Sequence, residues 1–577
     1  MRAVVVVLGL AAAACSTTRT RLPVPLSPPA DVPLRVVDVA PLRPSRPPAT
    51  DCSIAPASGP SPWWADSVGY EVFVRSFRDS DGDGVGDLAG LSEKLDYLND
   101  GDPATDTDLG IGLLWLMPVT RSPSIHGYDV TDYRDVEPDY GTLEALAMLT
   151  AEAKKRGIAI VADLVINHTS RLHPWFQASK RSPSDPKRGW YRWLEHPPSG
   201  WGQPWSTGTP VWHPAKDGVY YGVFSPDMPD LDFTNAEVRA EIADIARFWL
   251  ERGLAGFRLD AARYLVETGP GAAQADTPET HATWRELGAA MRTTRADALL
   301  LGEVWTATTT VATYVSDGAE LSAAFDFDRA EALRTGLRTG ALSAWLAAIC
   351  RATALVPTPG RLFTFATNHD LERLPTALGA STSPALLRLA AVLALTSPGT
   401  PMLYYGEELG LPNGPRAGDL GARLPMPWDT SPTRGFSTGA APWSGADTLA
   451  PAELSVGAQW AEPTSLLSLH RRLIRLRRAH PALMAGGFRR LDAGAQGLVA
   501  YVRPHGTRPV VVVANPTRTS IQDVRVDLAP ILNSALASTV HALEVSAPDA
   551  PRLEGALLVL GHLPPATYSV VELSLAP

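Results

Sequence analysis

Short apolar runs alternate with amphipathic, helix-like stretches over most of the chain. Stretches such as 143–155 and 236–251 carry the helical period and follow such runs. Strands that alternate with helices predict parallel βαβ units, and eight of these units close a (β/α)8, or TIM, barrel. The apolar runs are 68–77, 111–119, 158–167, 255–260, 299–304, 323–327, 362–367 and 401–405. The pattern therefore predicts a barrel domain at 63–483.

A doubly wound open sheet is the other architecture that such a pattern allows. It would usually open with a Gly-rich phosphate loop, and the sequence has none. The third run is followed by an irregular stretch rich in Trp, Pro and Gly, which predicts an inserted domain at 168–232. Past residue 483 the helical pattern stops. Short runs at 498–502, 510–513 and 569–573 predict a C-terminal all-β sandwich domain at 484–577.

The first residues have the features of a targeting signal. Arg2 precedes an unbroken apolar stretch at 3–14, too short to span a bilayer, and Cys15 follows three alanines. The segment resembles a bacterial lipoprotein signal, although Ala12 stands where Leu is usual. We expect a signal peptide at 1–14, a lipid on Cys15 and export to the membrane, with Ser16 favouring the outer membrane. An ordinary cleaved signal peptide, which would make the protein secreted, is the alternative.

Residues 15–62 are rich in Pro, Ser, Thr and Arg, which predicts a semi-extended linker. Cys52 falls within this linker, whereas Cys350 lies in an apolar helical pattern typical of a buried thiol. An exported protein could pair these two cysteines, but the sequence gives no geometry for a disulfide.

The composition is that of a soluble globular protein, with 45% hydrophobic and 19% charged residues. The formal net charge of -10 argues against a nucleic-acid partner, because phosphate binding requires a basic surface. A neutral sugar polymer makes no such demand, and the flat rings of some of the 16 Trp suit the CH faces of sugars. Most of these rings are expected to pack in the core. We expect a monomer.

Acidic residues end three of the predicted strands. Asp260 ends the fourth run, Glu303 follows the fifth, and Asp370 follows the seventh. One such carboxylate would more often be a surface cap or an ion-pair partner. Three of them at the carboxyl ends of strands in one barrel, where barrel enzymes place their active sites, indicate catalysis.

The segments around these residues resemble the α-amylase superfamily, glycoside hydrolase family 13. The resemblance extends from about residue 63 to the C-terminus, and the segments come in the family's order. They are 163–168, 228–232, 256–264, 302–305 and 365–370, with 127–130, 404–408 and 423–428 beside them. As an ordered set they are far more specific than any one segment alone.

The resemblance implies a retaining glycoside hydrolase that acts by double displacement. Asp260 would be the nucleophile, Glu303 the general acid and base, and Asp370 a ligand of sugar hydroxyls. Arg258, two residues before Asp260 and so on the same strand face, would keep that carboxylate ionised. The other substrate-binding residues that the resemblance implies are Tyr128, Asp129, His168 and His369.

Two calcium sites are predicted. The first lies in the loop after the first run, where alternating acids with a turn glycine resemble the start of an EF-hand loop. Gly90 stands where an EF-hand has its bidentate Glu, and the loop is similar instead to that of oligo-1,6-glucosidases; a solvated acidic turn is the alternative. Its ligands would be Asp79, Asp81, Asp83, the Val85 carbonyl and Asp87. The second site, implied by the resemblance, would use Asn167, Asp230, the Tyr264 and Leu265 carbonyls and Glu267.

The neighbours of the carboxylates suggest the substrate. Segment 228–232 lies between the oligo-1,6-glucosidase and neopullulanase forms, and Ala261 resembles members that act on α-1,4 bonds. Segment 302–305 is amylase-like, whereas Arg263–Tyr264 is similar to trehalose synthases. We therefore expect hydrolysis of α-1,4-glucosidic bonds in starch, maltodextrins and related glucans. The alternatives are a 4-α-glucanotransferase or trehalose synthase-type transglycosylase, and a non-catalytic glycan-binding lipoprotein.

Overall fold

Eight parallel strands close into a barrel in the computed structural model, which describes residues 52–56, 61–358, 360–379, 383–439, 441–532 and 537–575. Each strand pairs with the next along the chain, and the last pairs with the first through Leu403 and Tyr70. The strands are β2 (Gly69–Val72), β3 (Leu113–Leu116), β6 (Ala159–Leu164), β10 (Gly256–Leu259), β11 (Leu299–Gly302), β12 (Ala323–Phe325), β13 (Leu362–Thr364) and β14 (Thr400–Tyr404). The predicted (β/α)8 fold is confirmed.

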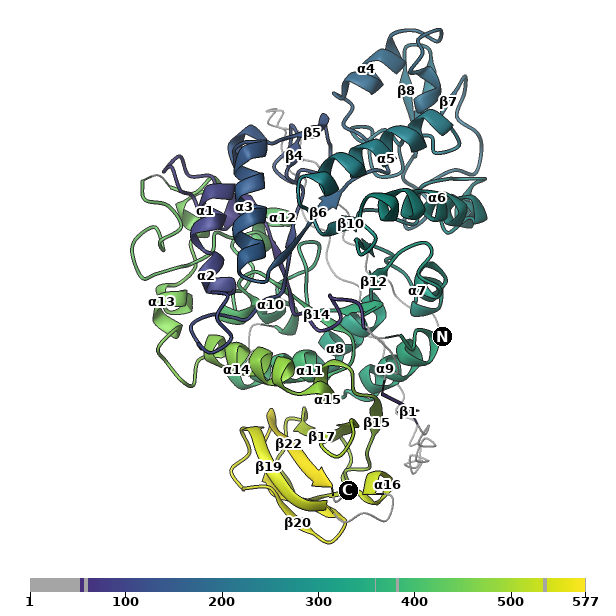
Figure 1. The fold of residues 1–577 in the computed structure, drawn as a ribbon. Coiled ribbons are helices and arrows are strands. Elements are labelled where there is room, and N and C mark those ends of the chain that lie inside the picture. The colour runs from purple at the N-terminus through teal and green to yellow at the C-terminus, as the bar shows by residue number, and fades with distance from the viewer. Residues whose placement is uncertain are drawn as a thin grey trace, which may run out of the picture. The chain divides into compact units, whose positions relative to one another are not determined.

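Helices surround these strands (Figure 1). The longer ones are α3 (Leu143–Lys155), α5 (Ala236–Glu251), α6 (Pro278–Thr294), α7 (Thr308–Val315), α8 (Phe327–Thr339), α9 (Ser343–Leu355), α11 (Pro384–Thr396) and α14 (Leu466–Ala479). The shorter ones are α1 (Leu88–Glu93), α2 (Leu95–Leu98), α10 (Leu374–Leu378), α12 (Asp419–Ala422), α13 (Val456–Gln459) and α15 (Pro481–Met484). Short 3₁₀ helices lie at Val74–Ser76, Pro138–Tyr140, Arg188–Trp190, Gly271–Gln274, Glu407–Leu409, Ala446–Thr448 and Ala452–Leu454.

Helix α3 illustrates how the sequence sets these helices. The Thr142 side chain accepts a hydrogen bond from the Ala145 amide and so caps the first turn. Lys154 and Lys155 lie in the last turn, where positive charge complements the helix dipole. Leu146 and Leu149, with their helical spacing, are buried on the face toward the barrel.

The segment after β6 forms a small domain of its own. It contains α4 (Pro174–Arg181) and a three-stranded sheet, β7 (Trp193–Leu194), β9 (Gly218–Tyr221) and β8 (Trp212–Ala215). A β-bridge joins His168 to Asp230, so the two ends of the segment lie side by side at the carboxyl end of β6. A hairpin of β4 (Thr120–Arg121) and β5 (Asp132–Val136) follows β3.

The C-terminal residues form two antiparallel sheets with an apolar core between them, as predicted. The larger sheet has the order β1 (Ser53–Ile54), β15 (Phe488–Arg490), β16 (Val499–Arg503), β17 (Val510–Asn515), β22 (Thr567–Leu575) and β19 (Ala537–Val545). The smaller sheet contains β18 (Ile521–Asp527), β21 (Leu557–Leu563) and β20 (Arg552–Glu554), and α16 is Ala529–Leu532. Tyr501 hydrogen-bonds the Thr396 hydroxyl of α11 at 2.6 Å, which joins the larger sheet to the barrel.

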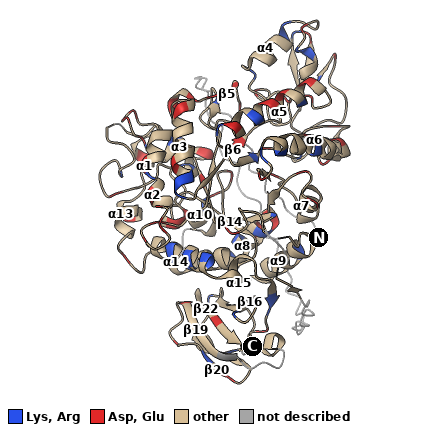
Figure 2. Ribbon diagram, in the orientation of Figure 1, with Lys and Arg blue, Asp and Glu red and all other residues tan. Residues whose placement is uncertain are grey.

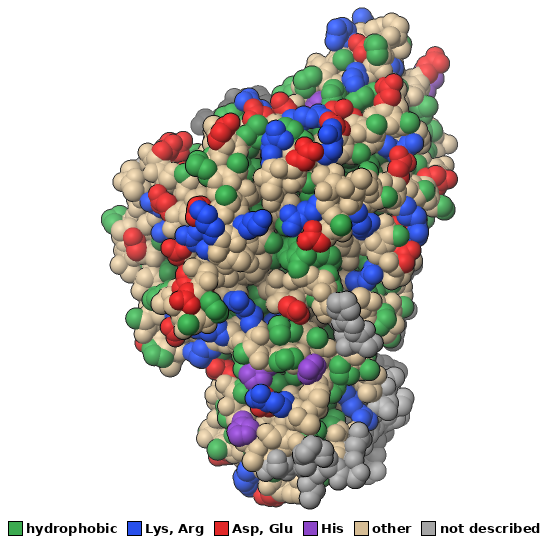
Figure 3. All heavy atoms as spheres, in the orientation of Figure 1, with side chains coloured by type: hydrophobic (Ala, Val, Ile, Leu, Met, Phe, Trp, Pro, Cys, Tyr) green, Lys and Arg blue, Asp and Glu red, His purple; other side chains and the backbone are tan. Residues whose placement is uncertain are grey.

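Helix α14 contains five arginines, which appear as blue segments along it in Figure 2. Arg477 is fully buried and donates to the carbonyls of Leu395, Ser397 and Gly399, between α11 and β14. Arg471 donates to the carbonyls of Asp106 and Asp108 in the loop before β3. These two arginines therefore connect α14 to neighbouring segments by hydrogen bonds inside the protein. On the face shown in Figure 3, acidic and basic side chains are interspersed rather than gathered by sign.

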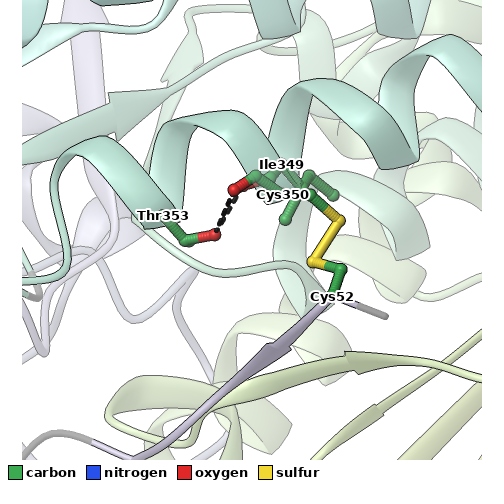
Figure 4. Close-up of a disulfide and its surroundings, with 4 residues drawn as sticks. All are labelled: Cys52, Ile349, Cys350 and Thr353. Atoms are coloured by element: carbon green, nitrogen blue, oxygen red, sulfur yellow. Dashed lines mark hydrogen bonds between the residues drawn. A yellow bond between two sulfur atoms is a disulfide. The ribbon is translucent and has the colours of Figure 1, made fainter. Parts of the chain in front are cut away.

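Cys52 forms a disulfide with Cys350 of α9, with their Cα atoms 5.7 Å apart (Figure 4). Directly after Cys52, Ser53 and Ile54 form β1, which pairs with β15. The sequence analysis placed this segment in the 15–62 linker because the stretch is rich in Pro, Ser, Thr and Arg. A two-residue edge strand has too few side chains to leave an apolar pattern against that composition. Cys350, interpreted as a buried thiol, is instead one half of this cross-link.

The expected signal peptide at 1–14 and the lipidated Cys15 lie outside the described residues. Within the part of the chain that the structure describes, no helix has the length and apolar character needed to cross a membrane.

We predict that Cys52→Ser lowers the free energy of unfolding by about 2–4 kcal/mol, because the cross-link closes a loop spanning 298 residues of the unfolded chain. Denaturant titration of the oxidised wild type and the variant measures the difference. Reductant should lower the stability of the wild type to that of the variant and leave the variant unchanged. Equal stability of oxidised wild type and variant would contradict this.

Candidate active site

The barrel brings the three predicted carboxylates to the carboxyl ends of its strands. Asp260 follows β10 directly, Glu303 follows β11 directly, and Asp370 lies in the segment after β13. β10 and β11 are paired neighbours with Leu259 opposite Gly302, so Asp260 and Glu303 extend from adjacent positions. The pairing of β10 with β11 thus brings two residues that are 43 positions apart in sequence to neighbouring strand ends.

A single guanidinium connects the nucleophile and acid candidates. Arg258 Nη1 donates to Asp260 Oδ1 at 2.6 Å, and Arg258 Nη2 lies 3.1 Å from Glu303 Oε1. The same Nη1 donates to Asp163 Oδ1 at 2.7 Å. Arg258 lies on β10 and is 1% exposed, so water screens these contacts little. Two carboxylates held on neighbouring nitrogens of one guanidinium are necessarily close together.

The electrostatics of the cluster reflect this burial. Burial raises the pKa of Asp260, and the positive charge of Arg258 acts against that rise. Asp163 is subject to the same two effects in the same order, and its pKa is also raised by burial. Arg258 itself remains a cation, because the surrounding carboxylates raise its pKa well above the ordinary value despite burial. The cluster therefore consists of three acidic side chains arranged around the permanent positive charge of Arg258.

Asp370 belongs to a second group of charges. Its Oδ2 lies 3.1 Å from His369 Nε2, and its Oδ1 lies 4.0 Å from Arg423 Nη2. Burial would raise the pKa of Asp370, but His369 and then Arg423 hold it below its usual range. Asp370 is therefore an anion at neutral pH, which suits a hydrogen-bond acceptor for sugar hydroxyls.

The remaining substrate-binding candidates lie on loops around this cluster. The Tyr128 ring stacks on His369, with centroids 5.5 Å apart and planes 13° apart. His168 Nε2 donates to the Tyr128 carbonyl at 2.9 Å, and burial lowers the pKa of His168 to about 4, so this ring is neutral. Asp129 does not join the Arg258 cluster. It accepts hydrogen bonds from Ser122 and Ser124, within the loop after β4.

The sequence analysis missed a backbone contact at Ala261. This residue has φ of +48°, in the left-handed region that only glycine adopts readily, and its amide donates to Glu303 Oε2 at 3.0 Å. The strained turn after the nucleophile candidate therefore orients the carboxylate of the acid candidate. Nothing in the sequence marks a positive φ at an alanine.

The sequence analysis also did not predict other aromatic rings near the candidate site. Trp305, two residues after Glu303, is 46% exposed and stacks on Phe327 at 4.7 Å. In the inserted domain, Trp205 and Phe224 contact the Tyr264 ring. A signal was available for Trp305, since this residue lies only three positions after the end of β11.

The first predicted metal loop is partly assembled. Carboxylate oxygens of Asp79, Asp81 and Asp87 lie within 4.8 Å of one another, close enough to hold a metal ion. Asp79 accepts from the Gly82 and Gly84 amides, which fold the loop around this carboxylate, and both glycines have positive φ. Asp83 lies outside the cluster and accepts from the Val85 amide at 2.7 Å.

Among the residues predicted for the second calcium site, some have unpartnered oxygens and one is already paired with an arginine. Asn167 Oδ1 and Asp230 Oδ2 are buried oxygens without a hydrogen-bond partner among the described residues, as expected of atoms that face a cation. Burial and then the Glu267 charge raise the pKa of Asp230. Glu267, however, already pairs with Arg192 at 2.8 Å. Tyr264 and Leu265 lie in the segment after β10, close in sequence to Glu267.

Comparison with known proteins identifies the family. The family model for the alpha amylase catalytic domain matches residues 71–486. The chain belongs to the alpha-amylase family. It is 34% identical to "Alpha-amylase 3" of Dictyoglomus thermophilum over 79% of this chain and 86% of that protein. It is 33% identical to "Trehalose synthase/amylase TreS" of Mycobacterium tuberculosis over 79% of this chain and 82% of that protein.

Solved structures agree with this membership. The crystal structure of an alpha-amylase from H. orenii superposes with a TM-score of 0.75 at 33% identity, covering 88% of this chain and 99% of that one. The trehalulose synthase from Pseudomonas mesoacidophila superposes with a TM-score of 0.77 at 28% identity, covering 89% of this chain and 100% of that one. The relatives of this chain thus include proteins named as amylases, glucosidases and trehalose synthases.

For this alpha-amylase-family chain we predict that Ala261→Val lowers the free energy of unfolding by about 1–3 kcal/mol. A β-branched residue is strained at positive φ, and the site is 3% exposed. Ala261→Gly, which tolerates this φ, is the matched control and should be neutral or slightly stabilising. Denaturant titration of both variants measures the effect, and equal stability of the two would contradict it.

Proposed function

We propose that this protein hydrolyses α-1,4-glucosidic bonds of starch, maltodextrins and related α-glucans with retention of anomeric configuration. The observation that carries the proposal is the pair Asp260 and Glu303 on the two nitrogens of Arg258. Retaining enzymes place these groups about 5–5.5 Å apart, whereas inverting enzymes need about 6.5–9.5 Å to admit water. A shared guanidinium supports the shorter separation.

The reaction proceeds in two displacements. Asp260 attacks the anomeric carbon, the glycosidic C–O bond breaks, and Glu303 gives its proton to the leaving oxygen. A water molecule then loses a proton to Glu303 and attacks the same carbon, which releases Asp260. Arg258 stabilises Asp260 as the anion that attacks and the anion that leaves. Asp370, as an anion, accepts hydrogen bonds from sugar hydroxyls.

Transfer to a sugar is the second candidate. The exposed Trp305 ring, stacked on Phe327 beside Glu303, offers an apolar face to an acceptor sugar. Relatives include a protein named for both trehalose synthase and amylase. Hydrolysis is favoured by Ala261 and by the amylase-like segment 302–305, and the intact carboxylates disfavour a purely glycan-binding role.

We predict that Asp260→Asn lowers kcat on amylose or maltotriose by about 10⁴-fold, because no glycosyl ester can then form. Asp326→Asn is the matched control. Asp326 is a buried carboxylate in the same barrel, directly after β12, but it caps α8. This variant should lose stability and keep activity within about tenfold.

The same assay should examine the products. Glucose and maltose from maltotriose, with the new reducing end formed as the α-anomer in proton NMR, support hydrolysis with retention. Longer oligomers or trehalose as the main products would show that the enzyme transfers the glucosyl group to a sugar rather than to water. No turnover of any α-glucan by the wild type would refute both and leave glycan binding.

We also propose that the protein binds Ca²⁺. The oxygen cluster of Asp79, Asp81 and Asp87 supports one site, with Asp83 and the Val85 carbonyl as further ligands, since Ca²⁺ prefers carboxylate and carbonyl oxygens. The unpartnered oxygens of Asn167 and Asp230 support a second site. A bound ion there would neutralise buried carboxylates and hold the inserted domain to the barrel.

Chelation is expected to lower Tm. If Ca²⁺ is present at about a hundred times its Kd, its removal costs about 2.7 kcal/mol of stability. Asp81→Asn should reduce the Ca²⁺-dependent shift of Tm. Asp102→Asn, in an exposed acidic turn at some distance along the chain, should leave it unchanged. An identical Tm with EDTA and with excess Ca²⁺ would contradict the proposal.

We further propose export and anchoring through a lipid on Cys15. The apolar stretch before Cys15 supports this, and so does the Cys52–Cys350 disulfide, because such bonds persist in oxidising compartments. In this arrangement the enzyme acts as a monomer on glucans outside the cytoplasm.

A further inference from the structure

Glu71 is a carboxylate in the interior of the barrel, in the middle of β2. It is fully buried, and it stands between Tyr70 and Val72, which pack in the main apolar core. Its Oε1 accepts a hydrogen bond from His369 Nδ1 at 2.5 Å. Its Oε2 is buried without a partner among the described residues. A buried carboxylate destabilises a fold unless a cation compensates it, so its presence requires an explanation.

The compensating group is His369, which uses both of its ring nitrogens. Nδ1 faces Glu71, while Nε2 lies 3.1 Å from Asp370 Oδ2 and 2.7 Å from the Tyr128 hydroxyl. The Tyr128 hydroxyl donates its own proton to Asp163 Oδ2 at 3.1 Å, so it must accept from His369. Both ring nitrogens therefore act as donors, and only the imidazolium has two N–H groups.

We propose that Glu71 is a positioning residue of the active site, whose carboxylate holds His369 as an imidazolium and thereby fixes Asp370 and Tyr128. The proposal rests on the function proposed above, in which Asp370 and Tyr128 contact the sugar. Glu71 itself lies behind His369 and acts only through it. A neutral His369 could offer one N–H, and either Glu71 or the Asp370–Tyr128 pair would lose its donor.

Charged and titratable groups surround His369 on several elements. Glu71 lies on β2, Asp163 on β6, Arg258 on β10, and Asp370 follows β13. Tyr128 and Arg423 approach from loops, and the Trp115 ring lies edge-on at 5.5 Å. Burial lowers the pKa of His369, but the carboxylates of Asp370 and Glu71 raise it to about 10. The imidazolium is thus present below that pH and is lost as pH rises through it.

Glu71→Gln tests the inference, because glutamine keeps the shape and a carbonyl acceptor while it removes the negative charge. His369 should then lose its second proton at a pH lower by about one unit or more. ¹⁵N NMR of histidine-labelled protein follows this titration, with the His369 signal assigned by its loss in His369→Gln. The alkaline limb of the pH profile of kcat/KM should move by the same amount.

Glu408→Gln is the matched control. Glu408 is also fully buried and accepts from the hydroxyls of Tyr70 and Tyr97 at 2.8 and 2.6 Å, without contact to His369. Its neutralisation should change stability and leave the His369 titration unchanged. In a His369→Gln background, Glu71→Gln should have no further effect on kcat/KM.

Two results would overturn the inference. One is a neutral His369 in the wild type at pH 8, which needs no variant and so stands even if Glu71→Gln fails to fold. The other is an unchanged His369 titration in folded Glu71→Gln. The NMR titration can be measured whether or not the protein cleaves a glucan. If the wild type cleaves no glucan but the His369 titration still shifts in Glu71→Gln, the proposed function is refuted while the effect of Glu71 on His369 stands.

Discussion

The active site depends on one buried cation. Arg258 binds Asp163, Asp260 and Glu303 with a side chain that is 1% exposed, and without it these acids would be unpaired charges in a medium that solvates them poorly. Its guanidinium cannot be deprotonated at any pH at which the fold survives, so the compensation is permanent. The barrel supplies the geometry, because the strand register places Arg258 opposite Asp163 on β6 and beside β11, the strand that directly precedes Glu303. The chemistry of the site is therefore arranged around a charge that is fixed in place before any substrate arrives.

Much of this could be predicted from the sequence. Eight apolar runs predicted the eight barrel strands because strands buried on both faces of a parallel barrel read as continuous apolar segments. The carboxylates could be located because a polar residue directly after such a run lies at the active edge. Three other features could not be predicted from the sequence. The edge strand β1 has only Ser53 and Ile54, the positive φ of Ala261 depends on the packing around it, and the disulfide joins residues 298 positions apart. Each is a property of tertiary contact, which no local pattern records.

Glu71 shows a signal that could have been read. A single carboxylate inside an apolar run, on a strand with no exposed face, contradicts the ordinary burial preferences. Such a residue must have a partner from elsewhere in the fold, although its identity requires the three-dimensional arrangement. Here the partner is His369, from a segment 298 residues later in the chain. The barrel interior thus contains two linked layers of charge, one around Arg258 and one around His369, and Asp163 contacts members of both.

The bond between Cys52 and Cys350 also has a mechanical consequence. Residues that precede Cys52 connect to the folded body at a covalent cross-link to α9, followed at once by the hydrogen bonds of β1 to β15. A pulling force applied through those residues would enter the molecule at α9, on the outer ring of helices, and would bypass the strands that present Asp260 and Glu303. A load from the N-terminal side of the chain would thus be divided between α9, through the disulfide, and β15, through the hydrogen bonds of β1, before it reached the segment that leads into β2.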